Sequence, residues 1–184
     1  MTRHETSWDS FSWRRLGLIG FAVVFAVAAY NYFKTQDQLK RQKAGEELTQ
    51  EFEAESFAIL RDASGPDELR DAVGSQGHFF FLSEEAWIAV RYSDSHNYHA
   101  FASSAVAVDS GGNWWVSHEH FCGRFNMFRK QLARVANAKD AEMREYEIHR
   151  LESYSQLNAL QNSESLDAAH VMLRELGFRA ASPP

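Results

Sequence analysis

This sequence of 184 residues is poor in cysteine and lacks recognisable catalytic motifs. Cys122 is its single cysteine, so no disulfide can form within one chain and a disulfide-stapled scaffold is excluded. The glycine and cysteine patterns of P-loop, dinucleotide-binding, thioredoxin-like and c-type haem proteins do not occur either. The sequence therefore carries no signature of a bound cofactor or of a catalytic centre, and we expect neither.

The sequence also lacks an excess of positive charge. Its 19 Lys and Arg residues are outnumbered by 25 Asp and Glu residues, which gives a formal net charge of −6. Proteins that bind nucleic acid usually carry a basic surface. The composition therefore argues against nucleic acid as a partner.

Formal charge is missing altogether from residues 16–33, LGLIGFAVVFAVAAYNYF. As a helix this segment would span roughly 27 Å, close to the roughly 30 Å of a bilayer's hydrocarbon core. Aromatic side chains lie before it and at its C-terminal end, as they do at the two membrane interfaces; they are Trp8, Phe11, Trp13, Tyr30, Tyr32 and Phe33. We predict a single transmembrane helix over residues 16–33, preceded by a short tail at 1–15, with the lipid bilayer as its first partner.

A cleaved signal peptide is the alternative for this segment, because Ala26-Val27-Ala28 matches the small-residue cleavage pattern after an apolar run. The flanking positive charges do not decide the orientation, since they are nearly balanced: Arg3, Arg14 and Arg15 precede the segment, and Lys34, Lys40, Arg41 and Lys43 follow it. Arg14 and Arg15 adjoin the apolar core directly. We therefore expect a cell-membrane protein with its soluble domain on the non-cytoplasmic side.

Three small residues of this helix, Ala22, Ala26 and Ala29, have the spacing i, i+4 and i+7 and share one face. Small side chains allow another membrane helix to approach closely. We predict that this face contacts other membrane-protein subunits. The alternative is that alanine is simply common in membrane helices.

Residues 34–63 are rich in Gln, Glu, Lys and Ala and contain no proline, which predicts a helical stalk beside the membrane. A basic band in this stalk precedes an acidic band, an order suited to lipid headgroups and then a partner helix. A solvated helix face explains the same pattern. Ser64-Gly65-Pro66 breaks the helix and begins a small α+β domain at residues 64–179.

The centre of this domain has the pattern of an antiparallel β-meander. Residues 98–108 and 114–121 flank a turn at 109–113, and a further strand is expected around 87–92. A three-residue loop would pair Val108 with Trp114 and Val106 with Val116, which places apolar residues on a common face. We prefer this register, because a slip by one residue would turn every side chain to the other face.

Helices are expected after the sheet. Phe125, Phe128, Leu132 and Val135 form an apolar stripe at helical spacing that would cover one sheet face. The stripe lapses at 136–140, which predicts two helices or a bend. A last helix is expected at 166–176, capped by Ser163 or Ser165 at its start and by Gly177 at its end, with a frayed tail at 180–184. A short helix at 66–73 completes the predicted α+β fold.

His118, His120 and Cys122 alternate along the predicted strand 114–121 and its end, so their side chains would point to one face. Histidine and cysteine are common metal ligands, which makes these three the candidate metal site. His118 and Cys122 would lie about 13 Å apart on an extended strand, too far for one ion. A hydrogen-bonded structural cluster is therefore the favoured interpretation.

If the sheet were covered on one face only, Trp115 and Phe121 would be exposed beside His99 and Phe101. Exposed apolar patches of this kind usually mark protein contacts. We therefore predict a single-pass membrane-anchored accessory or scaffold subunit of a larger membrane complex, and not an enzyme. The alternative is a membrane-anchored metal-binding or hydrolytic domain that uses the His and Cys cluster.

Overall fold

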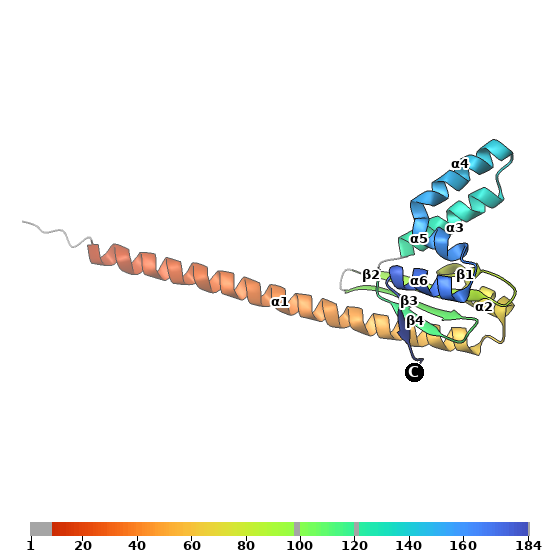
Figure 1. Cartoon of the computed structure of the whole chain (residues 1–184). Coiled ribbons are helices and arrows are strands. Elements are labelled where there is room, and N and C mark those ends of the chain that lie inside the picture. The colour runs from red at the N-terminus through yellow and green to blue at the C-terminus, as the bar shows by residue number, and fades with distance from the viewer. Residues whose placement is uncertain (1–8, 98–99, 120–121, 184) are drawn as a thin grey trace, which may run out of the picture. The chain divides into compact units, whose positions relative to one another are not determined.

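The computed structural model of the chain describes residues 9–97, 100–119 and 122–183. It divides into two compact units, Met1–Lys43 and Ala44–Pro184. The first contains the N-terminal part of helix α1 (Asp9–Asp62), and the second contains the rest of α1 together with a sheet and further helices (Figure 1). The protein is thus of the α+β class.

Helix α1 runs for 54 residues and confirms the predicted helix at 16–33 and its continuation into residues 34–62. Within the described chain it is the one helix that is long and apolar enough to span a membrane, by length and composition. None of its most apolar stretch is buried. Large apolar side chains that are exposed there include Leu18, Ile19, Phe21, Val23, Val24, Phe25, Val27 and Phe33.

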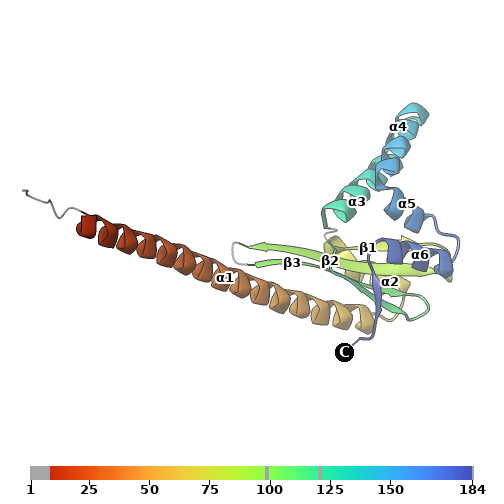
Figure 2. The same cartoon turned by 60° about the vertical axis from the view of Figure 1, so that its left-hand side comes forward.

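The sheet has five antiparallel strands, each paired with its neighbours in the sequence (Figure 2). The strands are β1 (Gly77–Phe81), β2 (Trp87–Asn97), β3 (Ala100–Asp109), β4 (Trp114–Ser117) and β5 (Arg179–Ala181). The predicted hairpin register is confirmed, because Val108 pairs with Trp114 and Val106 with Val116. This register gives the sheet an apolar face on which α1 can pack.

Two predicted boundaries around the sheet are wrong. β4 ends at Ser117, so the strand expected at 114–121 is too long. At the C-terminus, the tail expected at 180–184 instead begins with β5, in which Ala180 pairs with Trp115. Phe178 explains this difference, because its ring is buried in the core and holds the following residues against the edge of β4.

The helices follow the predicted pattern closely. They are α2 (Pro66–Val73), α3 (Cys122–Ala136), α4 (Ala141–Leu151), α5 (Ser155–Gln161) and α6 (Leu166–Glu175), with short 3-10 turns η1 (Gly74–Gln76) and η2 (Glu152–Tyr154). Ser165 caps α6, since its Oγ accepts a hydrogen bond from the Ala168 amide. Gly177 ends it at a φ of 82°, a left-handed conformation that favours glycine.

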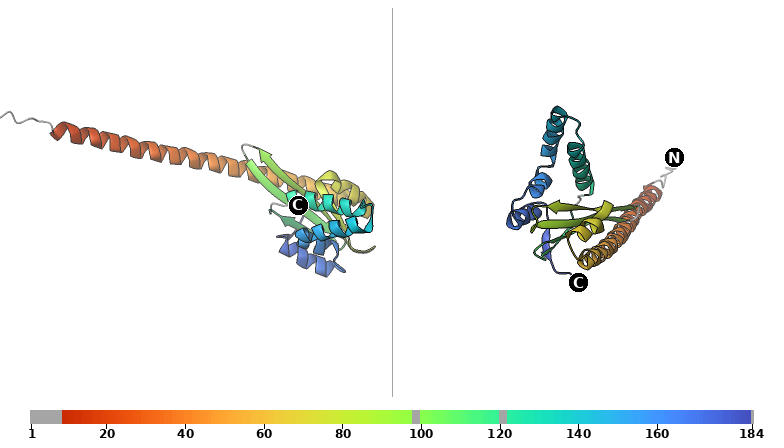
Figure 3. Two further views of the ribbon diagram at one scale, coloured as in Figure 1. Left: turned by 90° about the horizontal axis from the view of Figure 1, so that it is seen from above. Right: turned by 90° about the vertical axis from the view of Figure 1, so that its right-hand side faces the viewer.

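Both faces of the sheet are covered, which the sequence analysis did not assume (Figure 3). On one face the end of α1 and α2 enclose an apolar core formed by Phe57, Leu60, Leu69, Val73, Ala89, Val106 and Val108. On the other, α3, α5 and α6 enclose a larger core that includes Phe80, Ile88, Val90, Phe125, Phe128, Leu160, Leu173 and Phe178.

The folded unit therefore begins at Ala44 and not at residue 64. The second half of the expected stalk, residues 44–62, is part of the domain because Phe57 and Leu60 bury their side chains against the sheet. A helix that supplies core residues in this way is structural and cannot be removed without exposing a sheet face.

The packing of α1 can be tested with two leucines of the same helix. Leu60→Ala should lower the free energy of unfolding of the domain by about 2 to 5 kcal/mol, because Leu60 is only 3% exposed and its loss leaves a cavity. Leu39→Ala is the matched control, since Leu39 is 54% exposed. Chemical denaturation of the full chain in detergent measures both, and equal effects would show that α1 is not part of the core.

Candidate functional site

The predicted metal ligands do not lie along one strand. His118 follows the end of β4, and Cys122 is the first residue of α3, while His120 lies outside the described residues. The strand geometry on which the candidate site rested is therefore wrong, because the chain leaves the sheet after Ser117. In the described ranges, no group of three His, Cys, Asp or Glu side chains is placed to hold a metal ion.

His118 instead joins the sheet to α1. Its Nε2 donates a hydrogen bond to Glu53 Oε1 at 2.7 Å, and the hydroxyl of Ser104 donates to the same oxygen at 2.8 Å. One carboxylate oxygen of α1 thus links β3 to the segment after β4. The contact supports the structural interpretation of His118.

A buried arginine forms a second polar contact under α1. Arg91 of β2 donates from Nη2 to Glu55 Oε1 at 3.1 Å and to Gln76 Oε1 at 3.2 Å. Its Nε and Nη1 atoms, and the hydroxyl of Ser56, are buried and have no hydrogen-bond partner among the described residues. Because a buried charge is unfavourable without partners, Arg91 depends on its contacts with Glu55 and Gln76.

Trp115 is not part of an exposed patch. Its side chain is 4% exposed, because α6 covers this face of the sheet. The ring of His170 lies 4.8 Å from the ring of Trp115, and the guanidinium of Arg174 lies 5.6 Å from it. The prediction that Trp115 is an exposed contact residue is wrong. Phe121, the other contact residue predicted in the domain, lies outside the described residues, as does His99.

Asp109, at the end of β3, is the centre of a polar network that the sequence analysis missed. It is 1% exposed. Its Oδ1 accepts from the amides of Gly111 and Asn113 at 2.9 and 3.0 Å, and Asn113 Nδ2 also donates to it. Its Oδ2 accepts from Trp115 Nε1 at 3.3 Å and from His170 Nε2 at 2.7 Å. The Asp-Ser-Gly-Gly-Asn turn was a signal for the first of these contacts, but α6 could not be foreseen as a partner.

Hydrogen bonding keeps the Asp109 carboxylate ionised. Burial by itself raises the pKa of Asp109, but the hydrogen bonds from Asn113, His170 and Trp115 outweigh it and hold that pKa below its usual range. Asp109 and His170 form an acid–histidine pair, as in a hydrolytic triad, but the carboxylate binds Nε2, the nitrogen that faces the nucleophile in a triad. In the described part of the chain, however, no serine or cysteine side chain bonds to His170. The network therefore acts as a clamp between the β3–β4 turn and α6.

His78 is a second buried titratable group, on β1 beneath α3. Its ring lies 4.4 Å from the ring of Phe80 and 5.7 Å from that of Phe128, and its Nε2 lies 3.3 Å from Gln161 Oε1. Burial lowers the pKa of His78; the hydrogen bond to Gln161 opposes this shift, and the charge of Arg129 adds to it. His78 is therefore held in its neutral form.

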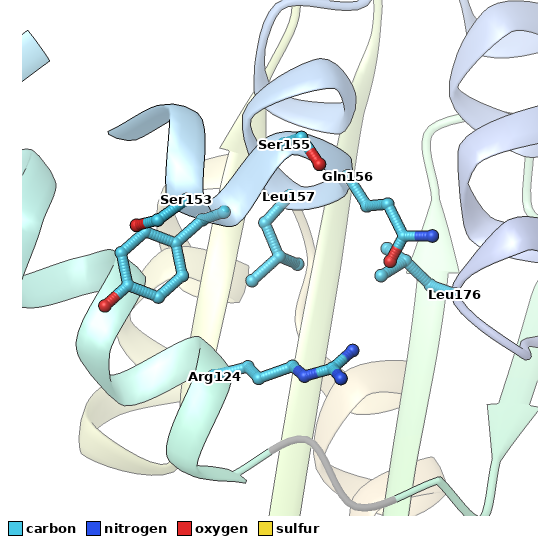
Figure 4. A pocket seen from close by; sticks show the side chains of 7 residues that line it. Arg124, Ser153, Ser155, Gln156, Leu157 and Leu176 are labelled. Atoms are coloured by element: carbon cyan, nitrogen blue, oxygen red, sulfur yellow. The ribbon is translucent and has the colours of Figure 1, made fainter. Parts of the chain in front are cut away.

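A shallow hollow lies between the start of α3 and the start of α5 (Figure 4). Its volume is about 260 Å³, and its lining residues are Arg124, Ser153, Tyr154, Ser155, Gln156, Leu157 and Leu176. The Arg124 side chain extends along it opposite Leu157, with Ser153 to one side and Gln156 to the other. Binding pockets for small molecules usually occupy about 300 to 1,000 Å³, so the volume of this hollow lies just below that range.

The predicted helix contacts of Ala22, Ala26 and Ala29 lie on α1 as expected, in its exposed apolar part. Their role toward other subunits remains a prediction. Comparison of the chain with protein-family models, with curated proteins and with solved structures gave no match. The function therefore has to be argued from the surfaces and contacts described above.

The clamp around Asp109 can be tested by removing its charge. Asp109→Asn should lower the free energy of unfolding by about 2 kcal/mol or more, because an amide cannot accept from all five donors and leaves some of them buried without partners. Asp167→Asn, at an exposed position of α6, is the control and should change it by about 0.5 kcal/mol or less. Denaturant titration at neutral pH measures both.

The difference in free energy of unfolding between the wild type and Asp109→Asn should depend on pH. The folded-state pKa of Asp109 is lowered, so its contribution is complete above the unfolded value of about 3.9 and is lost as pH falls through the folded value. The difference between the wild type and Asp109→Asn should therefore shrink below about pH 4. A difference that persists undiminished in strong acid would contradict the ionised clamp.

His78 predicts a separate effect near neutral pH. Because its folded-state pKa is lowered, its contribution is complete above the unfolded value of about 6.5 and is lost as pH falls below it. His78→Leu should therefore lose less stability than the wild type between about pH 7 and pH 5. Unfolding measured across this range for both proteins tests the prediction, and parallel curves would refute it.

Proposed function

We propose that this chain is a single-pass membrane protein whose folded domain works through protein contacts, as an accessory or scaffold subunit of a larger membrane complex. The observation that carries the proposal is the apolar stretch of α1, none of which is buried by the rest of the protein. Burying apolar surface is worth about 25 cal/mol per Å². A helix with this composition therefore gains much by entering a bilayer.

The same observation argues against the alternatives for α1. A core helix of a soluble domain would have its apolar side chains covered, and here they are exposed. The apolar region of a signal peptide is usually 7 to 15 residues long, whereas residues 16–33 match the thickness of a bilayer. The helix also continues without a break past Ala28, to Asp62.

A role through contacts is supported by how the polar side chains of the domain are used. Asp109, Glu53 and His78 are each engaged by neighbouring elements, so the groups most suited to catalysis have structural partners. The hollow beside Arg124 has a volume of about 260 Å³ and a wider one of about 400 Å³ lies beside Lys139 and Arg144, and neither is lined by a histidine or a cysteine. These observations favour a binding or scaffold module over the metal-binding or hydrolytic alternative.

The proposed topology places the N-terminus in the cytoplasm and the domain on the opposite side of the cell membrane. Its support is the position of Arg14 and Arg15 directly beside the apolar segment. Within the membrane, the face formed by Ala22, Ala26 and Ala29 is the proposed contact with a partner helix.

Membrane insertion can be tested with charges placed inside and outside the apolar segment. Val24→Asp combined with Phe25→Asp should remove the protein from the carbonate-resistant membrane fraction, because each charge opposes insertion by about 2.5 to 3.5 kcal/mol. Gln36→Asp combined with Leu39→Asp is the control and should leave it there. Release of the wild type by carbonate would contradict the proposal.

Two further readouts separate the alternatives. The mass of the isolated protein should include residues 1–28, since a chain cut after Ala28 would mean that the segment is a signal peptide. After gentle detergent extraction, the protein should purify with other membrane subunits or in a defined complex. A monodisperse monomer without a partner would argue against the role as a subunit.

A further inference from the structure

The α3–α4 hairpin, residues 122–151, packs on the sheet through Phe125 and Phe128 near the start of α3, and its far end projects away from the sheet (Figure 1, Figure 3). Its two helices are held together by Gln131, whose Nε2 donates to the backbone oxygen and to Oε2 of Glu147, both at 2.7 Å. Asp140 caps α4 by accepting from the Met143 amide at 2.8 Å. The hairpin is thus a defined projection.

This hairpin carries exposed apolar side chains among unpaired positive charges. Between 45% and 61% of each of four apolar side chains is exposed: Met127, Met143, Tyr146 and Ile148. The segment has seven Lys and Arg residues and four Asp and Glu residues, a net charge of +3. Five of its cations form no ion pair with any described residue: Arg124, Lys130, Arg134, Lys139 and Arg144.

The rest of the folded unit has the opposite charge. Residues 44–121 and 152–184 contain 18 Asp and Glu residues against five Lys and Arg residues, a net charge of −13. A dense group of these acids lies on α2 and on the connection between β1 and β2. We call it the acidic corner, formed by Asp67, Glu68, Asp71, Glu84 and Glu85, all of them exposed.

The acidic corner also has an apolar centre. α2 runs back along β1, because Val73 lies against Gly77 and the Arg70 guanidinium lies 5.2 Å from the ring of Phe79. This direction places Asp67 toward the end of β1, where Phe81 is 48% exposed. Glu84 and Glu85 follow in the next turn. The corner therefore combines an exposed aromatic ring with acids on two sides.

We propose that the α3–α4 hairpin of one copy binds the acidic corner of a second copy of this chain. This inference rests on the proposed function and names the partner. The hairpin is positively charged and the acidic corner is negatively charged, and both expose apolar side chains. This is the complementarity that protein interfaces require. Because the two surfaces differ, the contact is head-to-tail and joins successive copies into a ring or a row.

Two other destinations for the hairpin are less suitable. No ion pair between described residues joins the hairpin to the acidic corner of the same copy, so its cations are not used internally. Anionic lipid headgroups would attract the cations, but Glu142 and Glu145 on α4 would be repelled by them. On a second copy, Arg70 lies on α2 beside the acids of the corner with its side chain 55% exposed, so the acids of α4 also have an opposite charge to face.

A charge swap tests this interface. The hairpin variant combines Lys139→Glu with Arg144→Glu, and the corner variant combines Glu84→Lys with Glu85→Lys. Each variant alone presents like charges at the interface and should weaken self-association of the full chain in detergent by about tenfold or more. Mixing the two variants should restore association, because each altered surface then meets its complement. Sedimentation velocity at low and high salt measures these states.

Controls separate this interface from folding and from other binding. Glu164→Lys combined with Glu175→Lys, at exposed sites outside the corner, should leave association unchanged. Denaturation curves verify that each variant is folded. A folded monomer of the wild type in the membrane fraction would overturn the inference while leaving membrane anchoring intact. Self-association that neither charge swap weakens would also overturn the inference. A loss of association in the hairpin variant that mixing does not restore would overturn it too, and is the result expected if the hairpin binds lipid.

Discussion

The structure depends on one constraint: the sheet has two apolar faces, and each must be covered. Helices α3, α5 and α6 follow the sheet in the chain and cover one face, while the other relies on α2 and on the end of α1. Phe57 and Leu60 therefore tie the helix that carries the apolar segment to the domain core. Glu53 of α1 accepts from Ser104 of β3, and Arg91 of β2 donates to Glu55 of α1, so polar contacts also join α1 to the sheet.

Local patterns in the sequence were sufficient for much of the fold. The hairpin register followed from apolar alternation at Val106, Val108 and Trp114, and the start of α6 followed from the capping residue Ser165. Long-range contacts were not predictable in this way. The burial of Trp115 depends on α6, which lies about fifty residues further along the chain. β5 was likewise not predictable, because it forms by pairing with the free edge of β4, and no local sequence pattern marks that edge.

The candidate site was less predictable than the fold, for a related reason. Alternation of His118, His120 and Cys122 suggests a shared face only while the chain remains extended, and β4 ends before it reaches them. Asp109 and His170 are separated by 61 positions and come together only through tertiary packing. Neither outcome could be read from local spacing in the sequence.

The central claim is that the exposed apolar part of α1 lies in a bilayer while its other end belongs to the domain core. Spin labels on single cysteines at Val24 and Leu60, in a Cys122→Ser background and in lipid bilayers, test it most directly. The label at 24 should be accessible to dissolved oxygen but not to a water-soluble nickel chelate, and the label at 60 should be protected from both. Strong access of the nickel chelate to position 24 would contradict the account.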